Sequence, residues 1–216
     1  MTDWAERGVE RGADGRRRCP WSTGSDDYAA YHDDEWGRLV VDDVRLYEKL
    51  CLEGFQSGLS WLTILRKREA FRRAFAGFEP ETVARFGDAD VERLLGDAGI
   101  VRHRGKIEAA IANSRAVLDV QARHGSLAAL VWSFEPRRRG RPAPARLGDL
   151  AASTPESTAL SKELRRHGFR FVGPTTAYAA MQSLGLVNDH LRGCPARAAC
   201  EADRRAAAVP APALRR

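Results

Sequence analysis

Apolar side chains recur at helical spacing through most of the chain. Residues 42–58 carry apolar positions at i, i+3, i+4 and i+7, which lie on one face of an α-helix. Two acidic residues open this segment, and the glycine at position 58 is suited to end it. The stripe consists of Tyr47, Leu50, Cys51 and Gly54. The pattern therefore predicts a helix over 42–58.

Further segments carry helical signals, and the chain is predicted to be all-α. The segments are 61–75, 81–86, 89–95, 104–125, 153–168 and 174–185. The apolar sides of 61–75 and 104–125 are expected to consist of Leu62, Leu65, Phe71 and Phe75, and of Ile107, Ile111, Val117 and Val120. Residues 174–185 begin with proline and end with glycine, as helices commonly do. No strand pair, hairpin or internal repeat is recognisable.

The stretch AAYHDDEWG (29–37) follows neither the helical nor the strand period. It places His32 between two aromatic residues and a run of acidic residues. The spacing of apolar residues therefore does not explain His32, and its role has to be sought in the chemistry of its side chain.

The net charge of +6 on the 216 residues lies in three segments. Residues 1–18 carry +1, residues 137–146 carry +5 and residues 201–216 carry +2, which leaves about −2 for the remainder. We expect 1–18 and 201–216 to be disordered and 19–200 to form a single all-α domain, with 137–146 as a basic, proline-rich loop. A high net positive charge favours a polyanionic partner, but here the chain outside these three segments is not basic overall.

The sequence shows no sign of membrane insertion or secretion. No apolar run reaches the roughly 18 residues that span a bilayer. The N-terminal stretch lacks the apolar core of a secretory signal. We therefore expect a cytoplasmic protein without membrane contact, and we expect it to be a monomer.

Two cysteines and two histidines near the ends of the chain form a candidate metal site. His190 and Cys194 are spaced so that one helical turn or a tight loop brings both to one centre, and Cys19 precedes His32 by a short segment. Two Cys and two His complete a tetrahedral zinc site. Each of these residues alone could equally be a buried or surface side chain. As a set they would join the two ends of the chain.

Glu53 continues an apolar line on the helix predicted for 42–58. The line runs through Leu46 and Leu50 at helical spacing. The carboxylate either reaches solvent at the rim of this face or is buried in a pocket for chemistry or recognition. The adjoining turn GLSW (58–61) presents Leu59 and Trp61 beside it, which favours a pocket.

The segment HGFRFVGPTTAYAA (167–180) contains a turn before a helix. Gly173 precedes the helix start, with Thr175 and Thr176 in its first turn. Free backbone N–H groups there could hold a phosphate. The segment is either a generic helical turn or a helix-hairpin-helix element that binds DNA.

Taken together, these stretches resemble the 3-methyladenine DNA glycosylase I family. The matching segments span 19–194 and are RCPW, YAAYHDDEWG, LCLEGFQSGLSW, DAGIVRHRGKI, VWSF, LSKELRRHGFRFVGPTTAYAAMQSLGLVNDH and GC. The resemblance implies an all-α fold of the helix-hairpin-helix glycosylase superfamily, with a structural zinc that joins the N- and C-terminal segments. The implied zinc ligands are Cys19, His32, His190 and Cys194, which are also the four that spacing suggests.

The resemblance also implies a pocket for a base flipped out of DNA. Glu53, Tyr31 and Trp61 would share this pocket, with Glu53 in the catalytic role. N3-methyladenine in DNA is positively charged, and aromatic faces and a carboxylate both favour a cation. Leu59 is a candidate wedge for the gap left in the base stack. Further residues in matching stretches that could line the pocket are Trp21, Tyr28 and Trp36.

The implied reaction is hydrolysis of the N-glycosidic bond without lyase activity. Thr175 stands at about the position where lyase members of the superfamily carry a lysine. Asp189 lies downstream of the hairpin, and no catalytic role is assigned to it. The hairpin reads GFRFVG instead of the tighter Gly-x-Gly of the superfamily, which leaves its phosphate contacts open.

Two other functions compete with this one. The chain could be a non-catalytic, zinc-stabilised module that binds lesions or DNA. It could also be a glycosylase with a different base preference, tuned by Phe55 and Gln56 near the pocket. A buried Glu53 beside Tyr31 and Trp61 favours an enzyme, because a binding module needs no buried carboxylate.

Overall fold

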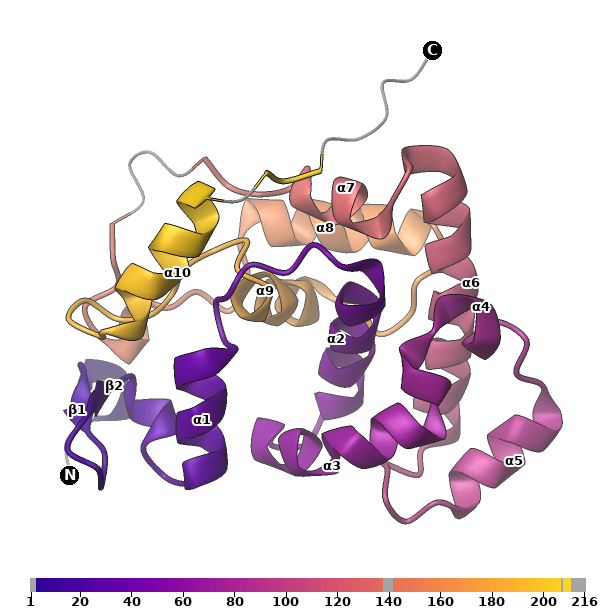
Figure 1. Cartoon of the computed structure of the whole chain (residues 1–216), viewed down its shortest axis with the longest axis horizontal. Helices are drawn as coiled ribbons and strands as arrows, with labels where there is room; N and C mark the ends of the chain where they lie inside the picture. Colours follow the sequence, from indigo (N-terminus) through magenta and orange to yellow (C-terminus); the bar gives the residue numbers. More distant parts are fainter. Residues whose placement is uncertain (1–2, 138–141, 207, 211–216) are drawn as a thin grey trace.

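The computed structural model describes residues 3–137, 142–206 and 208–210. Over these residues the chain is mostly helical, as predicted (Figure 1). The helices are α1 (Asp26–Asp34), α2 (Asp43–Gln56), α3 (Trp61–Ala74), α4 (Pro80–Val83), α5 (Asp88–Gly96), α6 (Arg104–His124), α7 (Leu127–Trp132), α8 (Pro155–Arg166), α9 (Pro174–Ser183) and α10 (Ala196–Ala206). Short 3-10 helices are η1 (Trp4–Glu6), η2 (Pro20–Ser22), η3 (Ala76–Phe78) and η4 (Leu147–Asp149). None of the described helices is both long and apolar enough to cross a membrane.

In the view of Figure 1, helix α2 lies at the centre of the fold, with α1 and α10 to one side, α4 to α6 to the other, and α3 below its lower end. Its predicted stripe is buried in the main core. Asp42 caps the helix by accepting a hydrogen bond from the Arg45 backbone N–H at 2.9 Å. The Tyr47 hydroxyl donates to the Ala110 carbonyl of α6 at 2.8 Å, which ties the two helices together in the core.

The predicted inner face of α3 is only partly correct. Phe71 and Phe75 are buried, but Leu62 and Leu65 are half-buried and Ile64 is the fully buried residue of the first two turns. Leu62 lies where α3 meets α1, so its backbone contacts a neighbour while its side chain keeps some exposure. For α6 the prediction is confirmed, since all four predicted residues are buried.

Helices α1, α7 and α10 were not predicted. The stretch 29–37 lies in α1 and the turn after it. Ser25 caps α1 by accepting from the Tyr28 N–H at 3.3 Å. The buried residues of α1 are adjacent in sequence, Tyr31 and His32, so no spaced apolar stripe marks the helix.

The N-terminal segment differs from the disordered extension that the sequence predicted. Strands β1 (Glu10–Arg11) and β2 (Arg17–Arg18) form a small antiparallel hairpin, which corrects the expectation that no hairpin is present. Arg18 is buried because its guanidinium bonds to both Asp14 and Asp33. The predicted C-terminal tail also begins later than residue 201, since α10 continues to Ala206. Part of the predicted loop 137–146, residues 138–141, lies outside the described residues.

Helices α8 and α9 form a helical hairpin whose turn is held by α6. Asn113 of α6 accepts from the Arg170 N–H at 2.7 Å and donates to the Arg170 carbonyl at 3.2 Å. The Ser161 hydroxyl donates to the Val172 carbonyl at 2.6 Å. Gly168 leaves α8 with φ of +91°, a conformation that glycine adopts without steric cost.

Candidate functional site

Four ligand-forming side chains from both ends of the chain meet in a buried cluster. Cys19 precedes η2, His32 lies on α1, and His190 and Cys194 lie between α9 and α10. The ligand atoms lie within 4.8 Å of one another. His32 Nε2 is 3.2 Å from His190 Nδ1 and 3.5 Å from Cys194 Sγ. Tetrahedral zinc with its usual bond lengths places neighbouring ligand atoms roughly 3.3–3.8 Å apart, so this donor set fits such an ion.

The groups around the cluster fix which imidazole nitrogen faces the centre. His32 Nδ1 is 2.8 Å from an Asp33 carboxylate oxygen, which leaves Nε2 for the centre. His190 Nε2 is 2.9 Å from the Trp36 carbonyl, which leaves Nδ1. Arg18 in turn holds Asp33 through contacts of 2.8 to 3.1 Å. Such outer partners orient metal ligands. Here Asp33 lies on α1 and Trp36 in the turn after it, while the N-terminal hairpin supplies Arg18, which holds Asp33.

Next to this cluster, Glu53 of α2 faces a cavity of about 280 Å³. All the aromatic residues predicted for the base pocket line it. The lining residues are Trp21, Tyr28, Tyr31, Trp36, Glu53, Gln56, Trp61, Leu150, Ala179 and Gln182. Of the two alternatives that the sequence left open for Glu53, the structure shows the buried carboxylate, because only 6% of the residue is exposed.

The aromatic rings pack against one another and against the four clustered side chains, which form the candidate metal cluster. Trp21 contacts Trp36 at 5.1 Å and Tyr28 at 5.7 Å between ring centroids. Trp36 contacts the His190 ring at 4.7 Å. The Tyr28 hydroxyl accepts a hydrogen bond from the Leu62 N–H at 3.0 Å, which links α1 to the start of α3. The candidate metal cluster therefore lies behind one wall of the cavity.

The charge of Glu53 is set by burial and by one nearby cation. Burial raises the pKa of Glu53, and the Lys49 ammonium opposes this rise. Lys49 Nζ lies 3.3 Å from a Glu53 carboxylate oxygen. Burial also lowers the pKa of Lys49 to about 8, although Glu53 acts to raise it. Glu53 and Lys49 therefore form an ion pair that is largely removed from water, with Glu53 facing the cavity.

The predicted DNA-facing residues lie outside this cavity. Leu59 is exposed at the α2–α3 turn, after Gly58 with its φ of +82°. Gly173 precedes α9 and supplies no capping side chain. Thr175 is exposed and Thr176 half-buried in the first turn of α9. The first N–H groups of a helix have no partner within the helix, so this turn presents donors.

Sequence reasoning missed two residues beside the carboxylate. Lys49 precedes Glu53 by one helical turn, a spacing that the sequence displays but that is common on exposed helix faces. Gln182 of α9 lines the cavity and donates to Asp189 at 2.9 Å. Asp189 also accepts from the Tyr178 hydroxyl at 2.6 Å, so it fixes side chains and does not line the cavity.

Of the two residues suggested to tune base preference, only Gln56 lines the cavity. Phe55 is buried in the core, where its ring contacts Phe71 at 4.6 Å. The suggestion for Phe55 is therefore wrong. Adjacent residues on a helix point in different directions, which explains why one faces the cavity and the other the core.

Comparisons with known proteins show the family to which the chain belongs. Residues 21–198 match the family model described as methyladenine glycosylase. DNA-3-methyladenine glycosylase 1 of Escherichia coli K12 is 48% identical over 177 residues, which cover 82% of this chain and 95% of that protein. DNA-3-methyladenine glycosylase of Haemophilus influenzae is 42% identical, covering 83% and 97%.

Solved structures show the same fold. A crystal structure of 3-methyladenine DNA glycosylase I, 49% identical, superposes with a TM-score of 0.77 and covers 82% of this chain and 98% of that one. The Staphylococcus aureus enzyme, 37% identical and studied for its recognition of 3-methyladenine, also gives 0.77, covering 83% and 96%. The chain therefore belongs to the methyladenine glycosylase family.

Proposed function

We propose that this protein excises 3-methyladenine from alkylated DNA by hydrolysing its N-glycosidic bond. The observation that carries the proposal is Glu53, a buried carboxylate at the wall of an aromatic cavity. An enzyme must extrude the base to reach the bond that joins it to the sugar. A flipped base would lie among Tyr31, Trp61 and Trp21, with Glu53 at its edge.

The chemistry of the lesion fits this cavity. N3-methyladenine in DNA is a cation, which aromatic faces attract and which a carboxylate stabilises. The base leaves as a neutral molecule, so the reaction needs little acid catalysis. The Trp61 indole N–H is buried and has no hydrogen-bond partner among the described residues, which leaves a donor on a residue of the pocket wall.

We also propose that the buried cluster holds one structural zinc ion. The residues that would hold it are Cys19, His32, His190 and Cys194. Zinc bound by four protein ligands has no open position and therefore supplies stability instead of chemistry. His32 and His190 are 158 positions apart in the chain, so the ion would join its two ends.

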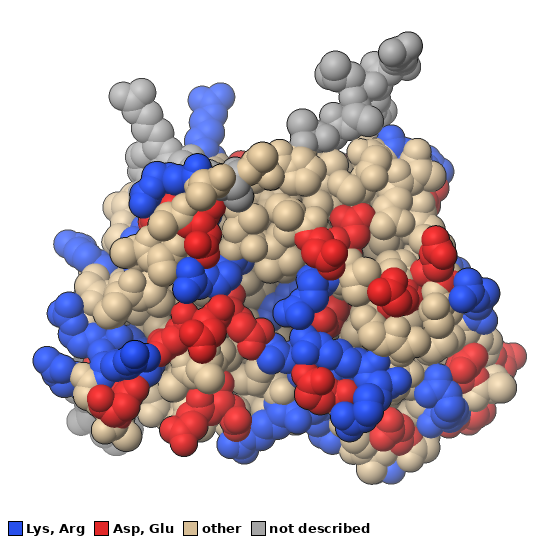
Figure 2. Space-filling model, in the orientation of Figure 1, with Lys and Arg blue, Asp and Glu red and all other residues tan. Residues whose placement is uncertain are grey.

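The proposed contacts to DNA come from two turns. The α8–α9 hairpin would act as a helix-hairpin-helix element, with Gly173, Thr175 and Thr176 near a phosphate. Leu59 would fill the gap that the flipped base leaves. Basic side chains gather over α3 (Figure 2), and the sequence of this helix includes Arg66, Lys67 and Arg73. Such a positive surface would attract the DNA backbone.

The proposed enzyme is a monofunctional hydrolase that works as a monomer in the cytoplasm. Thr175 has no amine with which to form a Schiff base, which supports the absence of lyase activity. Trapping of the protein on DNA with borohydride would contradict this assignment.

Release of free bases from methylated DNA separates an enzyme from a binding module. Methylated duplex is incubated with the protein, and free bases are separated by chromatography. We expect free 3-methyladenine and little 7-methylguanine, above a protein-free control that measures spontaneous loss. Lesion binding without release would instead assign the chain to the non-catalytic class.

A further inference from the structure

Lys49 places its ammonium against three residues of the proposed base pocket. Its Nζ lies 3.3 Å from Glu53 and donates a 2.5 Å hydrogen bond to the Tyr31 hydroxyl. The same Nζ lies 3.7 Å from the centroid of the Trp61 ring and 4.8 Å from that of Tyr31. Only 13% of the Lys49 side chain is exposed. A lysine is rarely buried to this extent without a specific partner.

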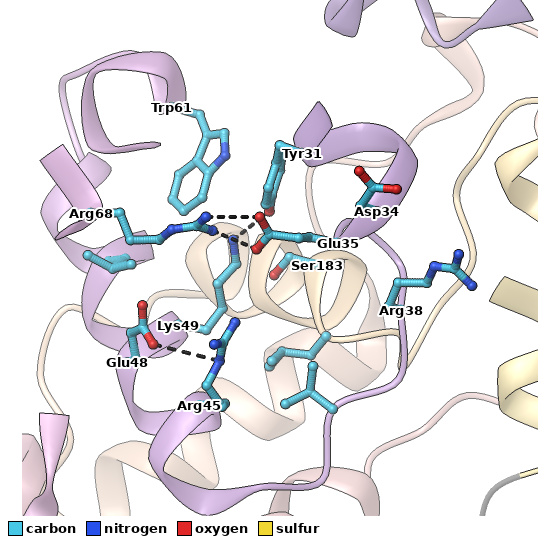
Figure 3. A pocket seen from close by; sticks show the side chains of 13 residues that line it. Tyr31, Asp34, Glu35, Arg38, Arg45, Glu48, Lys49, Trp61, Arg68 and Ser183 are labelled. Carbon is cyan, nitrogen blue, oxygen red and sulfur yellow. Dashed lines mark hydrogen bonds and ion pairs between the residues drawn. The ribbon is translucent and has the colours of Figure 1, made fainter. Parts of the chain in front are cut away.

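The lysine reaches these residues from the opposite side of the aromatic wall. A second cavity of about 170 Å³ lies there, and Tyr31 and Trp61 line both cavities. Figure 3 shows Lys49 rising from α2 between these rings and Glu35. Lys49 lines only this second cavity, whereas Glu53 lines only the base pocket. The ion pair therefore connects the two spaces behind the rings.

Two carboxylates that line this second cavity, Glu35 and Glu48, have arginine partners. Glu35 makes two contacts with Arg68, at 2.6 and 2.9 Å (Figure 3). Glu48 accepts from Arg72 at 2.8 Å and lies 3.7 Å from Arg45. Asp34 and Arg38 also line this cavity. Among the described residues, Lys49 forms its ion pair with Glu53.

We propose that Lys49 is a positioning residue that keeps Glu53 ionised and directed at the base from behind the aromatic wall. This inference rests on the proposed function of the pocket. A carboxylate removed from water keeps its proton unless a cation or hydrogen-bond donors stabilise its charge. Glu53 has Lys49 for that purpose, and the contacts with Tyr31 and Trp61 hold the ammonium in place.

Loss of this lysine changes how activity depends on pH. Burial already raises the pKa of Glu53, and Lys49 opposes that rise. In Lys49→Met no ammonium lowers the pKa of Glu53, so this carboxyl group keeps its proton to a higher pH. At acidic pH the pocket of this variant therefore lacks the negative charge of Glu53. Above about pH 9 Lys49 of the wild type is itself largely neutral, because burial lowers its pKa to about 8. The two proteins then carry the same charge in the pocket.

The test is the pH profile of kcat/KM for 3-methyladenine release by wild type, Lys49→Met and Lys49→Arg. We expect Lys49→Met to be about tenfold slower than wild type near pH 6 and to converge with it near pH 9. Lys49→Arg retains a cation and should keep the acidic limb near its wild-type position. Thermal unfolding confirms that each variant is folded, and Lys49→Gln replaces Lys49→Met if that variant is not.

The outcomes separate this inference from the proposed function. Wild type without any base release contradicts the proposed function. Base release by wild type together with a Lys49→Met profile that runs parallel to it at every pH contradicts the role of Lys49. In a Glu53→Gln background the Lys49→Met change should no longer alter the shape of the profile, because the group that Lys49 acts on is absent.

Discussion

The candidate metal cluster and the proposed base pocket are two buried polar sites that share a wall, yet their polar groups have different kinds of partner. In the candidate metal cluster each ligand atom faces other ligand atoms, and the outer ring nitrogens face Asp33 and a backbone carbonyl. In the base pocket Glu53 faces one lysine and a cavity. The two sites meet where the Trp36 ring contacts that of His190.

The difference indicates a division of roles. A closed set of four ligands stabilises the fold once a metal is bound, because the ion binds the folded chain and not the unfolded one. A buried ion pair beside a cavity contributes little to stability, since the desolvation of both charges offsets their attraction. Its retention is therefore better explained by function than by folding.

Removing a metal ligand should have the largest effect. We expect His190→Ala to lower the free energy of unfolding by more than about 4 kcal/mol and to abolish metal binding. Metal analysis and thermal unfolding measure both. Cys51→Ala is the matched control, because Cys51 is buried in the core outside the cluster, and it should leave the metal content at one ion per chain. Unchanged stability in metal-free wild type would contradict the structural role.

Breaking the ion pair should have a smaller effect that depends on which charge is removed. Glu53→Gln leaves Lys49 buried without its carboxylate, and we expect it to destabilise the protein by about 1–3 kcal/mol at pH 7. Replacing both residues, as in Lys49→Met with Glu53→Gln, should restore wild-type stability or exceed it. Chemical denaturation of the three proteins gives these values. A double variant less stable than Glu53→Gln would show that the pair stabilises the fold.

Removing an outer support of the candidate metal cluster should have the smallest effect on folding. Arg18→Ala leaves Asp33 without its buried cation, so we expect metal affinity to fall by about 10- to 100-fold while the fold is retained. Competition with a chelator measures the affinity. Arg17→Ala is the matched control, because Arg17 is the exposed neighbour in the same strand. Equal metal affinities in the two variants would show that Arg18 of the N-terminal hairpin does not support the metal ligands.

The sequence predicted those features that a local pattern encodes. Helices with a spaced apolar stripe, such as α2 and α6, were placed within two residues of their observed ends. The four clustered ligands follow from residue type and from the resemblance, since Cys and His near both ends of the chain suggest a shared centre. Glu53 places a carboxylate at the next position of the apolar line through Leu46 and Leu50, which is visible without a structure.

Features that depend on tertiary partners could not be predicted in the same way. Helix α1 buries adjacent residues because it contacts α3 on one side and the candidate metal cluster on the other. From the sequence, Arg18 is expected to belong to a basic, disordered N-terminal segment. In the structure it is buried because its guanidinium bonds to Asp14 and Asp33. In the sequence, Lys49 has the spacing of a surface lysine on a helix. It is covered only because α1 and α3 bring Tyr31 and Trp61 against it.

The most direct test of the pocket is the rate of 3-methyladenine release by Glu53→Gln compared with wild type and Glu48→Gln. Glu48 is an equally buried carboxylate on the same helix, but it faces Arg72 and not the base pocket. Removing one charged hydrogen-bonding group that acts on a cationic base should slow release by at least about tenfold. We predict that loss for Glu53→Gln and near wild-type release for a folded Glu48→Gln. Equal rates for the two variants would contradict the role of Glu53.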